Sequence, residues 1–489
     1  MIISKRYLTA FTDDSAPETR VTAIGKDGKT LFQLQIRHCK TGIDFYLDVE
    51  RFKGEEVKFI TDEGEFNFDG EAESIPDYSE AQRFRPKLHY TAPYGWLNDP
   101  NGLIYLNGEY HIFCQHNPLG TAWGNMHWYH SVTKDFISFK HIGNALFPEG
   151  TGTMFSGSAL CDTENVSGLG KNAILLFYTD ADYKNGFSQG LAYSFDGIHF
   201  TKYAGNPIVP NIKGENRDPK VVFVPEMSCF VMALYLDGDE YCLLKSDNLT
   251  DWKLFQSIRI NGDAECPDLY FLEKSKKWIL SGASDYYIVG HFDKNGFIPE
   301  QEPLQFFEEL DGRISYAAQS FSGLKDRALR LTWENISPNK RQCFCGQLSA
   351  PQEISLVTLG DGKMRLKAGL CKVFESKLSV IIKAASGSID IPSCAYVADI
   401  TFGSDVLMNV DGAELSVNTK KNAISFKDKK IPLSLSGKRN IRLVADKMNV
   451  EIFADDGLIF SCIKHICNSE RRNLSVFGKN AEVTVSILK

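Results

Sequence analysis

The stretch Gly190-Leu-Ala-Tyr-Ser-Phe-Asp-Gly-Ile-His-Phe200 joins a strand-like run to a polar turn that ends in an aromatic residue. The turn pattern recurs three more times, and its terminal aromatics are 61, 52 and 45 residues apart. Periods of about 50 residues built from short strands and hairpin turns are typical of β-propellers, in which each four-stranded sheet packs against its neighbours. Chance similarity between hairpin turns is the alternative on this signal alone. The other three copies are Asp135-Phe-Ile-Ser-Phe139, Asn248-Leu-Thr-Asp-Trp252 and Asp293-Lys-Asn-Gly-Phe297.

The composition agrees with a large globular protein rich in strands. A chain of 489 residues predicts two or three structural units. Hydrophobic residues at 43% and charged residues at 24% argue against long disorder. The 12% of aromatic residues and the 39 glycines favour short strands joined by turns. The net charge of -8 leaves no basic surplus for phosphates, so we expect no nucleic-acid partner.

The N-terminus and the cysteines bear on location. The first residues include two basic side chains but reach Thr12, Asp13 and Asp14 before any apolar core of a signal peptide. No run approaches the roughly 20 apolar residues of a membrane helix. The twelve cysteines are scattered without a CxxC pair, as is typical of reduced thiols. We therefore expect a cytoplasmic protein that binds no membrane, and a secreted protein that has lost its leader is the alternative.

Three β units are predicted along the chain. Period-2 alternation, as at Phe32, Leu34 and Ile36, predicts half-buried strands in a small N-terminal β domain over residues 1–80. The propeller is predicted over 86–345. A second run of strands with a hairpin signal at Asp455-Asp456-Gly457 predicts a C-terminal β-sandwich over 350–489. The N-terminal unit could pack on the propeller, form a subunit contact or narrow a pocket mouth. A homo-oligomer would form through this unit or the sandwich.

Six of the ten histidines lie between Leu88 and Phe147, so a metal site is the first hypothesis to test. The spacing argues against it, because His127 and His130 would point to opposite faces of a strand and no HExxH-like helix is present. We therefore predict no metal and expect these side chains to line a sugar site.

Three carboxylates occur in similar, proline-marked settings. Asp99 lies in Asn98-Asp99-Pro100-Asn101-Gly102, and its counterparts are Arg217-Asp218-Pro219 and Glu265-Cys266-Pro267-Asp268. Each could be an ordinary turn. However, the innermost strands of a propeller converge on one cavity, so the three acids could meet there. Glycoside cleavage needs one ionised carboxylate and one protonated carboxyl, and crowding raises the pKa of at least one acid. We expect Arg217 to keep Asp218 ionised.

The chain resembles glycoside hydrolase family 32, the invertase, levanase and fructan exohydrolase family. The motifs that carry the resemblance occur in the family order, and together they are specific where any single one is weak. The C-terminal run from Arg442 to Gly457 resembles the β-sandwich signature of the family, so the resemblance covers about residues 86 to 489. The motifs are Trp96-Leu97-Asn98-Asp99-Pro100-Asn101-Gly102, His111-Ile-Phe-Cys-Gln115-His-Asn-Pro118, Trp123 with Met126-His127-Trp128, Phe155-Ser156-Gly157-Ser158, Arg217-Asp218-Pro219-Lys220 and Glu265-Cys266-Pro267-Asp268.

The resemblance implies an all-β fold, a five-bladed β-propeller followed by a β-sandwich, and a retaining, exo-acting β-fructofuranosidase without cofactor or metal. Asp99 matches the nucleophile, Glu265 the general acid/base and Asp218 the transition-state stabiliser. The substrate would be a small carbohydrate: sucrose, sucrose phosphate or a short β-fructan. The predicted fructose subsite is Asn98, Gln115, Trp123, Phe155, Ser156 and Arg217, with Tyr316 and Trp333 added on weaker local matches; Trp96 is also expected to face fructose.

Two alternatives to hydrolysis stay open. A fructosyltransferase would use the same covalent intermediate and differ only in whether water or a sugar hydroxyl attacks it. A catalytically silent fructan-binding lectin is disfavoured, because all three carboxylates are present. Cys114 and Tyr129 replace an aromatic and a glycine of the usual pattern, so the identity of the leaving group also stays open.

Overall fold

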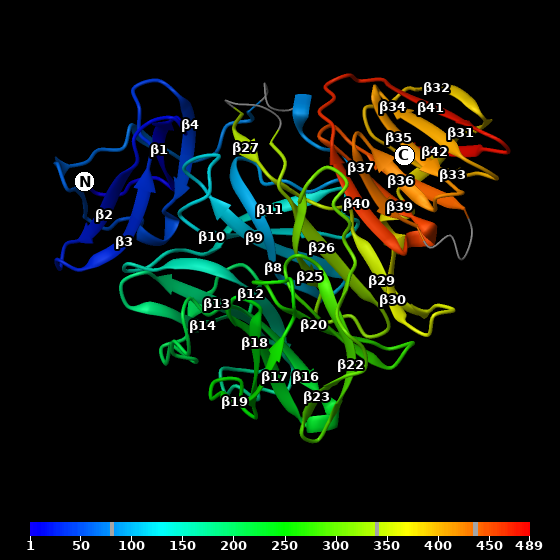
Figure 1. Cartoon of the computed structure of the whole chain (residues 1–489). Coiled ribbons are helices and arrows are strands. Elements are labelled where there is room, and N and C mark those ends of the chain that lie inside the picture. Colours follow the sequence, from blue (N-terminus) through cyan, green and yellow to red (C-terminus); the bar gives the residue numbers. More distant parts are fainter. Residues whose placement is uncertain (79–82, 338–341, 434–438) are drawn as a thin grey trace.

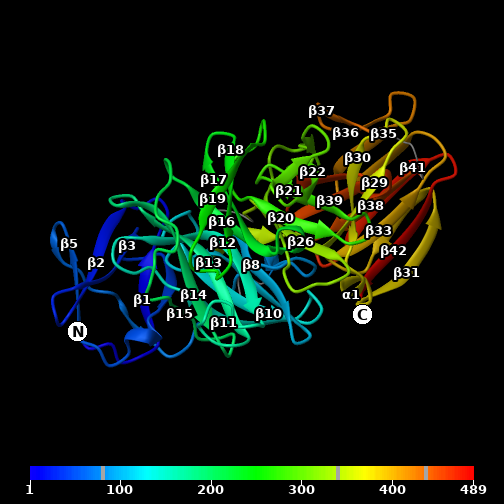
Figure 2. The same cartoon turned by 90° about the horizontal axis from the view of Figure 1, so that it is seen from below.

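The structure is a computed structural model that describes residues 1–78, 83–337, 342–433 and 439–489. It consists of a small N-terminal β domain, a central domain of five sheets and a C-terminal pair of sheets. The N-terminal domain and the C-terminal pair lie on opposite sides of the central domain (Figures 1 and 2). No helix among the described residues is long and apolar enough to cross a membrane.

The N-terminal domain is formed by two small sheets, ordered β4-β1-β7 and β3-β2-β5-β6. The predicted alternation is confirmed, since Phe32, Leu34 and Ile36 are buried on β3 while the residues between them are more exposed. The predicted end of this domain at residue 80 lies outside the described residues. The elements are β1 (Tyr7–Thr12), β2 (Thr19–Gly25), β3 (Thr30–Ile36), β4 (Ile43–Asp48), the 3-10 turn η1 (Glu50–Phe52), β5 (Val57–Thr61), β6 (Gly64–Glu65) and β7 (Gly70–Ala72).

The central domain contains five antiparallel sheets in chain order. The first four each begin with a strand near the centre and run outward through three hairpins. They comprise β8 (Gly95–Leu106), β9 (Glu109–Asn117), β10 (His127–Thr133) and β11 (Phe139–Leu146); β12 (Thr153–Asp162), β13 (Ala173–Asp182), β14 (Gly186–Ser194) and β15 (Thr201–Lys202); β16 (Arg217–Val224), η3 (Pro225–Met227), β17 (Cys229–Asp237), β18 (Glu240–Ser246) and β19 (Lys253–Arg259); and β20 (Asp268–Leu272), β21 (Lys277–Ser281), β22 (Tyr286–Asp293), β23 (Gly296–Pro299) and β24 (Leu304–Gln305).

The fifth sheet closes the ring. It contains β25 (Ser315–Ser320), β26 (Ala328–Glu334), β28 (Gln347–Leu348), β29 (Gln352–Thr358) and β30 (Met364–Leu370). The first strands of the five sheets contact one another in a closed circle, from β8 through β12, β16, β20 and β25 back to β8. The short strand β27 (Phe344–Cys345) leaves the fifth sheet and pairs in parallel with the start of β8. This circular arrangement is that of a β-propeller.

The recurring turn has the same position in each of the first four sheets, between the third and the fourth strand. In every copy the first side chain, an Asp or Asn, accepts hydrogen bonds from two backbone N–H groups further along the turn. Asp196 Oδ1, for example, accepts from Ile198 and His199, both at 2.8 Å. Such side-chain capping fixes a tight turn locally, which explains why the repeat is readable in the sequence. The equivalent acceptors are Asp135, Asn248 and Asp293.

The predicted boundary between 345 and 350 falls inside the fifth sheet. Strand β29 pairs with β26, and β30 pairs with β29, so the central domain continues to Leu370. An alternating strand pair has the same sequence pattern in a propeller sheet and in a sandwich sheet, so the pattern alone does not assign it.

The C-terminal domain is a sandwich of two six-stranded sheets, ordered β31-β42-β33-β38-β39-β40 and β32-β41-β34-β35-β36-β37. Aliphatic side chains of both sheets form one core, as predicted for a β-sandwich. The elements are α1 (Lys372–Glu375), β31 (Leu378–Ala385), β32 (Gly387–Ile391), β33 (Tyr396–Thr401), β34 (Val406–Val410), β35 (Ala413–Asn418), β36 (Ala423–Phe426), β37 (Lys429–Pro432), β38 (Asn440–Ala445), β39 (Asn449–Ala454), η4 (Asp455–Gly457), β40 (Ile459–Lys464), β41 (Arg472–Gly478) and β42 (Glu482–Leu488).

Candidate active site

One cavity gathers the three carboxylates and the eight subsite residues that the sequence assigned to the site. They come from all five propeller sheets, at the ends where the first strands begin. The cavity has a volume of about 160 Å³, below the roughly 300 Å³ of the smallest pockets for drug-sized ligands, so it suits a single sugar ring. Its lining is Asn98, Asp99, Gln115, Trp123, Met126, Phe155, Ser156, Arg217, Asp218, Glu265, Cys266, Tyr316 and Trp333.

Irregular backbone turns the site residues into the cavity. The register of β8 shifts between Leu97 and Pro100, and that of β16 shifts between Arg217 and Lys220. Such bulges re-aim a side chain near the end of a strand. Asp218 and Glu265 also adopt left-handed conformations, with φ of 66° and 59°. Asp tolerates this conformation better than most residues, whereas for Glu it is uncommon, and such backbone strain clusters at active sites.

Asp99 on β8 is held by Ser156 on β12. The Ser156 hydroxyl donates a hydrogen bond to Asp99 Oδ2 at 2.7 Å. Burial raises the pKa of Asp99 above its ordinary value, and the hydrogen bonds from Ser156 and Asn98 oppose that rise. The Asp99 carboxylate is thus stabilised by neutral hydrogen-bond donors rather than by a cation.

Glu265 lies just before β20 and has a partner on each carboxyl oxygen. Arg217 Nη2 donates to Oε1 and the Tyr316 hydroxyl donates to Oε2, both at 2.6 Å. Burial, followed by the charge of Glu265, raises the pKa of Tyr316, so this phenol stays protonated and remains a donor. The two donors fix the orientation of the Glu265 carboxyl.

The expectation that Arg217 keeps Asp218 ionised is corrected by the structure. Burial raises the pKa of Asp218 to about 7, and Arg217 opposes only part of this effect. Arg217 Nε lies 3.9 Å from Asp218 Oδ2, whereas the guanidinium makes its short contact with Glu265. The Cys266 backbone N–H donates to Asp218 Oδ2 at 2.9 Å. The protonation state of Asp218 therefore depends more on its burial than on the neighbouring Arg217.

Aromatic side chains form the walls. Trp123 and Phe155 meet edge to face, with ring centroids 5.8 Å apart. Trp333 lies on the other side of the cavity, next to Tyr316. The expectation that Trp96 faces fructose is wrong, because Trp96 is absent from the cavity lining. It packs on Trp333 and donates from its indole N–H to Asn98 Oδ1 at 2.7 Å, so it supports two residues that do line the cavity.

Two lining residues were missed by the sequence reasoning. Cys266 Sγ lies 3.6 Å from Asp99 Oδ2 and 3.5 Å from Asp218 Oδ2. Met126 lies in the same connection between β9 and β10 as Trp123. Both stand inside the quoted motifs, and they were passed over because neither side chain is an obvious proton donor or sugar platform.

The histidines of the stretch from Leu88 to Phe147 do not line the site, although other residues of that stretch do. Of the described residues that line the cavity, none is a histidine, so the expectation of sugar-site lining is wrong. Five of the six histidines pack inside the first sheet, where His130 stacks on Phe113 with centroids 4.1 Å apart, and His89 contacts the sandwich domain. Burial lowers the pKa of His116 to about 4 and that of His127 to about 3.

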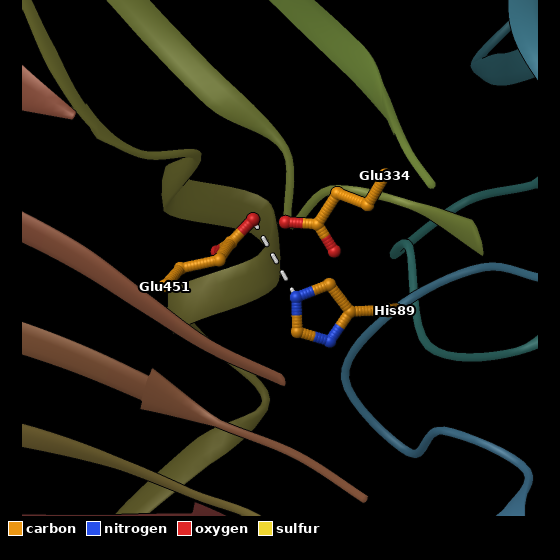
Figure 3. A group of neighbouring side chains, drawn as sticks. All are labelled: His89, Glu334 and Glu451. Atoms are coloured by element: carbon orange, nitrogen blue, oxygen red, sulfur yellow. Dashed lines mark ion pairs between the residues drawn. The ribbon is translucent and has the colours of Figure 1, made fainter. Parts of the chain in front are cut away.

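One group among the described residues brings metal-ligand atoms within 4.8 Å of one another, namely His89, Glu334 and Glu451 (Figure 3). It lies where the propeller contacts the sandwich. His89 Nδ1 lies 2.9 Å from Asp446, and Asn449 donates to Glu334 at 2.8 Å. Burial raises the pKa of Glu451 to about 7. A proton held there reduces the negative charge of the cluster, so the group acts as a polar contact between domains.

Three convergent carboxylates between aromatic walls have the chemistry of a glycoside-cleaving site. The family model described as "Glycosyl hydrolases family 32 N-terminal domain" matches residues 89–367, more than half of the chain. The chain therefore belongs to glycoside hydrolase family 32.

Two curated relatives are similar to part of this chain. The chain is 36% identical over 310 residues to a levanase of Bacillus subtilis (strain 168), which covers 57% of this chain and 46% of the levanase. It is 32% identical over 311 residues to an extracellular exo-inulinase of Aspergillus niger, which covers 52% of this chain and 58% of the exo-inulinase. The chain thus spans about half the length of the curated relatives it matches.

Solved structures share the fold. The exo-inulinase of Aspergillus awamori superposes with a TM-score of 0.72 at 23% identity, covering 83% of this chain and 98% of that chain. The sucrose-6-phosphate hydrolase of Lactobacillus gasseri superposes with a TM-score of 0.70 at 19% identity, covering 84% and 95%. These similarities agree with the β-propeller and β-sandwich seen here.

Proposed function

We propose that this protein is a retaining, exo-acting β-fructofuranosidase. The observation that carries the proposal is the convergence of Asp99, Asp218 and Glu265, from three different sheets, on one cavity sized for a single sugar ring. The names of the relatives, a levanase and an exo-inulinase, support a β-fructoside as the substrate.

In the first step, the Asp99 carboxylate attacks the anomeric carbon of the fructosyl unit while Glu265 gives its proton to the departing glycosidic oxygen. The carbon–oxygen bond to the leaving group breaks, and an ester bond to Asp99 forms. In the second step, Glu265 takes a proton from water, which attacks the same carbon and regenerates the Asp99 carboxylate. Asp218, which also lines the cavity, would bind fructose hydroxyls.

Exo action follows from the shape of the cavity. A cavity for one ring, with Trp123 and Phe155 as walls, takes the terminal fructosyl unit and leaves the remainder of the substrate outside. Cys114 and Tyr129, which differ from the usual residues of the family, are buried on strands, and neither is among the residues that line the cavity.

Product analysis tests this proposal. The purified protein is incubated with sucrose, sucrose 6-phosphate, kestose, inulin and levan, and the products are separated by chromatography. Free fructose from at least one substrate, without internal cleavage of the polymers, is the expected result. Longer oligosaccharides in place of fructose would indicate transfer to a sugar hydroxyl. Binding without any cleavage would overturn the proposal in favour of a lectin.

A further inference from the structure

The loop of residues 118–126, between β9 and β10, carries Trp123 into the cavity wall. Trp123 is 52% exposed, so burial does not fix its ring. Its edge contact with Phe155 constrains only one side. The position of Trp123 therefore depends on contacts that other parts of the protein make with the backbone of this loop.

The N-terminal domain supplies this support. Strand β3 is an edge strand of its sheet, and its outer edge faces the loop through Gln35. The Asn125 side chain pairs with Gln35 as a neighbouring strand would: Gln35 N donates to Asn125 Oδ1 at 2.7 Å, and Asn125 Nδ2 donates to Gln35 O at 2.6 Å. Both backbone groups of Gln35 are thus satisfied by one side chain of the active-site loop.

Two further contacts join the N-terminal domain to the same loop. The buried Thr12 hydroxyl donates to Leu119 O at 3.1 Å, and the Thr121 hydroxyl donates to the carboxylate of Asp14. The contact points at 119, 121 and 125 bracket Trp123 on both sides, so the loop is anchored before and after the wall residue.

The loop is also connected to the strand that carries Phe155, on which Trp123 packs. Met126 O accepts hydrogen bonds from Met154 N at 2.9 Å and from Thr153 Oγ1 at 3.0 Å, at the start of β12. Strand β12 continues directly into Phe155 and Ser156. Phe147, in the connection that leads to β12, packs on Phe32 of the N-terminal domain with ring centroids 5.0 Å apart.

The side chain and the backbone conformation of Asn125 both fit this position in the loop. Its φ of 48° lies in the left-handed region, which Asn tolerates better than most residues. Its Nδ2 also donates to Asn117 Oδ1 at 3.1 Å, and Asn117 Nδ2 donates to Ala122 O at 2.9 Å, next to Trp123. A continuous set of hydrogen bonds thus runs from β3 to the wall residue.

We propose that the N-terminal domain is a positioning element of the active site, and that Asn125 is the positioning residue through which strand β3 holds Trp123 against the sugar pocket. This inference rests on the proposed function for its kinetic consequence. A wall contacts the fructosyl ring in the ground state and the transition state alike, so loosening it raises KM and changes kcat little.

The test replaces Asn125 with glycine, which removes the side chain and keeps the left-handed backbone available. Asn107→Gly is the matched control, because Asn107 has a φ of 50° in the exposed turn between β8 and β9. Thr12→Val removes the hydrogen bond that the N-terminal domain donates to Leu119 O, and it changes the shape of the side chain little. For the cleaved fructoside, Asn125→Gly is expected to raise KM by about 5–30-fold, and Thr12→Val by about 3–10-fold, with kcat within about twofold. Asn107→Gly is expected to match the wild type.

Hydrogen exchange gives a readout that does not depend on activity. In Asn125→Gly, the amide of Leu119, which donates to the Asn117 side chain that Asn125 also contacts, is expected to lose protection while the amides of β1 and β2 keep theirs. If the wild type cleaves a β-fructoside and Asn125→Gly matches Asn107→Gly in KM and in exchange, the positioning role is overturned and the proposed function stands. If the wild type cleaves none, the proposed function fails, and the exchange measurement alone decides the positioning role.

Discussion

Replacing Ser156 with alanine tests the role of Asp99 most directly. The change removes the hydrogen bond that Ser156 donates to Asp99 Oδ2 at 2.7 Å. This donor lowers the pKa of Asp99 against the larger opposing effect of burial, so its loss raises that pKa further. A hydrogen bond to a charged group contributes about 1.5–3 kcal/mol, and one pKa unit corresponds to about 1.4 kcal/mol. The change is therefore expected to disfavour the ionised form of Asp99 by about 1.5–3 kcal/mol and so to raise its pKa.

The assay is the pH dependence of kcat/KM for the best fructoside, from about pH 4 to about pH 9. Asp99 must be ionised to attack, so the acidic limb of the Ser156→Ala profile should move to higher pH, and activity should recover as the pH rises. Ser158→Ala is the control on the same strand, because Ser158 donates to Pro219 O at 2.8 Å and not to a carboxylate. An acidic limb that stays at the wild-type pH in Ser156→Ala would refute the reasoning.

Three further changes test other parts of the molecule. Glu265→Gln should lower kcat by about 10²–10⁴-fold, because it removes the transferable proton, with an unchanged circular dichroism spectrum; near-normal turnover would contradict the assignment. The folded state favours the protonated form of Glu451, whose pKa burial raises to about 7, so this stabilisation is present at low pH and lost as the pH rises through about 7. The melting temperature of Glu451→Gln should therefore fall less than that of the wild type from about pH 6 to about pH 8, and equal slopes would argue against this. Arg330 pairs with buried Asp285 at 2.6 and 2.8 Å, so Arg330→Met should lower the unfolding free energy by about 3–5 kcal/mol in urea titrations. Adding Asp285→Asn should recover part of that loss, and an unchanged Arg330→Met midpoint would count against a stabilising pair.

The sequence predicted those features of the fold that depend on interactions between residues close together in the chain. The turn beginning at Asp196 caps its own backbone, so its repeat reports successive sheets directly. The alternation at Phe32 and Leu34 likewise predicts one buried face of β3. The side chains of Asp99, Asp218 and Glu265 meet in one cavity, as the motifs predicted, because ring closure brings the starts of the first strands together.

Properties that depend on tertiary packing were not predicted. The pKa of Asp218 follows from its depth in the cavity, and the neighbouring Arg217 in the sequence gave the opposite expectation. Trp96 lies in a site motif but faces Trp333. The pairing of Asn125 with Gln35 joins residues of two domains, and no periodicity or spacing in either segment indicates it.

The parallel pairing of β27 with β8 makes the strand that carries Asp99 depend on a distant part of the chain. Phe344 pairs with Gly95, and Cys345 pairs with Trp96, beside the turn that presents Asp99. During synthesis, the start of β8 emerges long before its partner and remains an open edge, which is the kind of surface on which chains aggregate. Contacts between such distant residues also slow folding. Expression at low temperature or with a holding chaperone should therefore raise the yield of active protein more than it raises total synthesis.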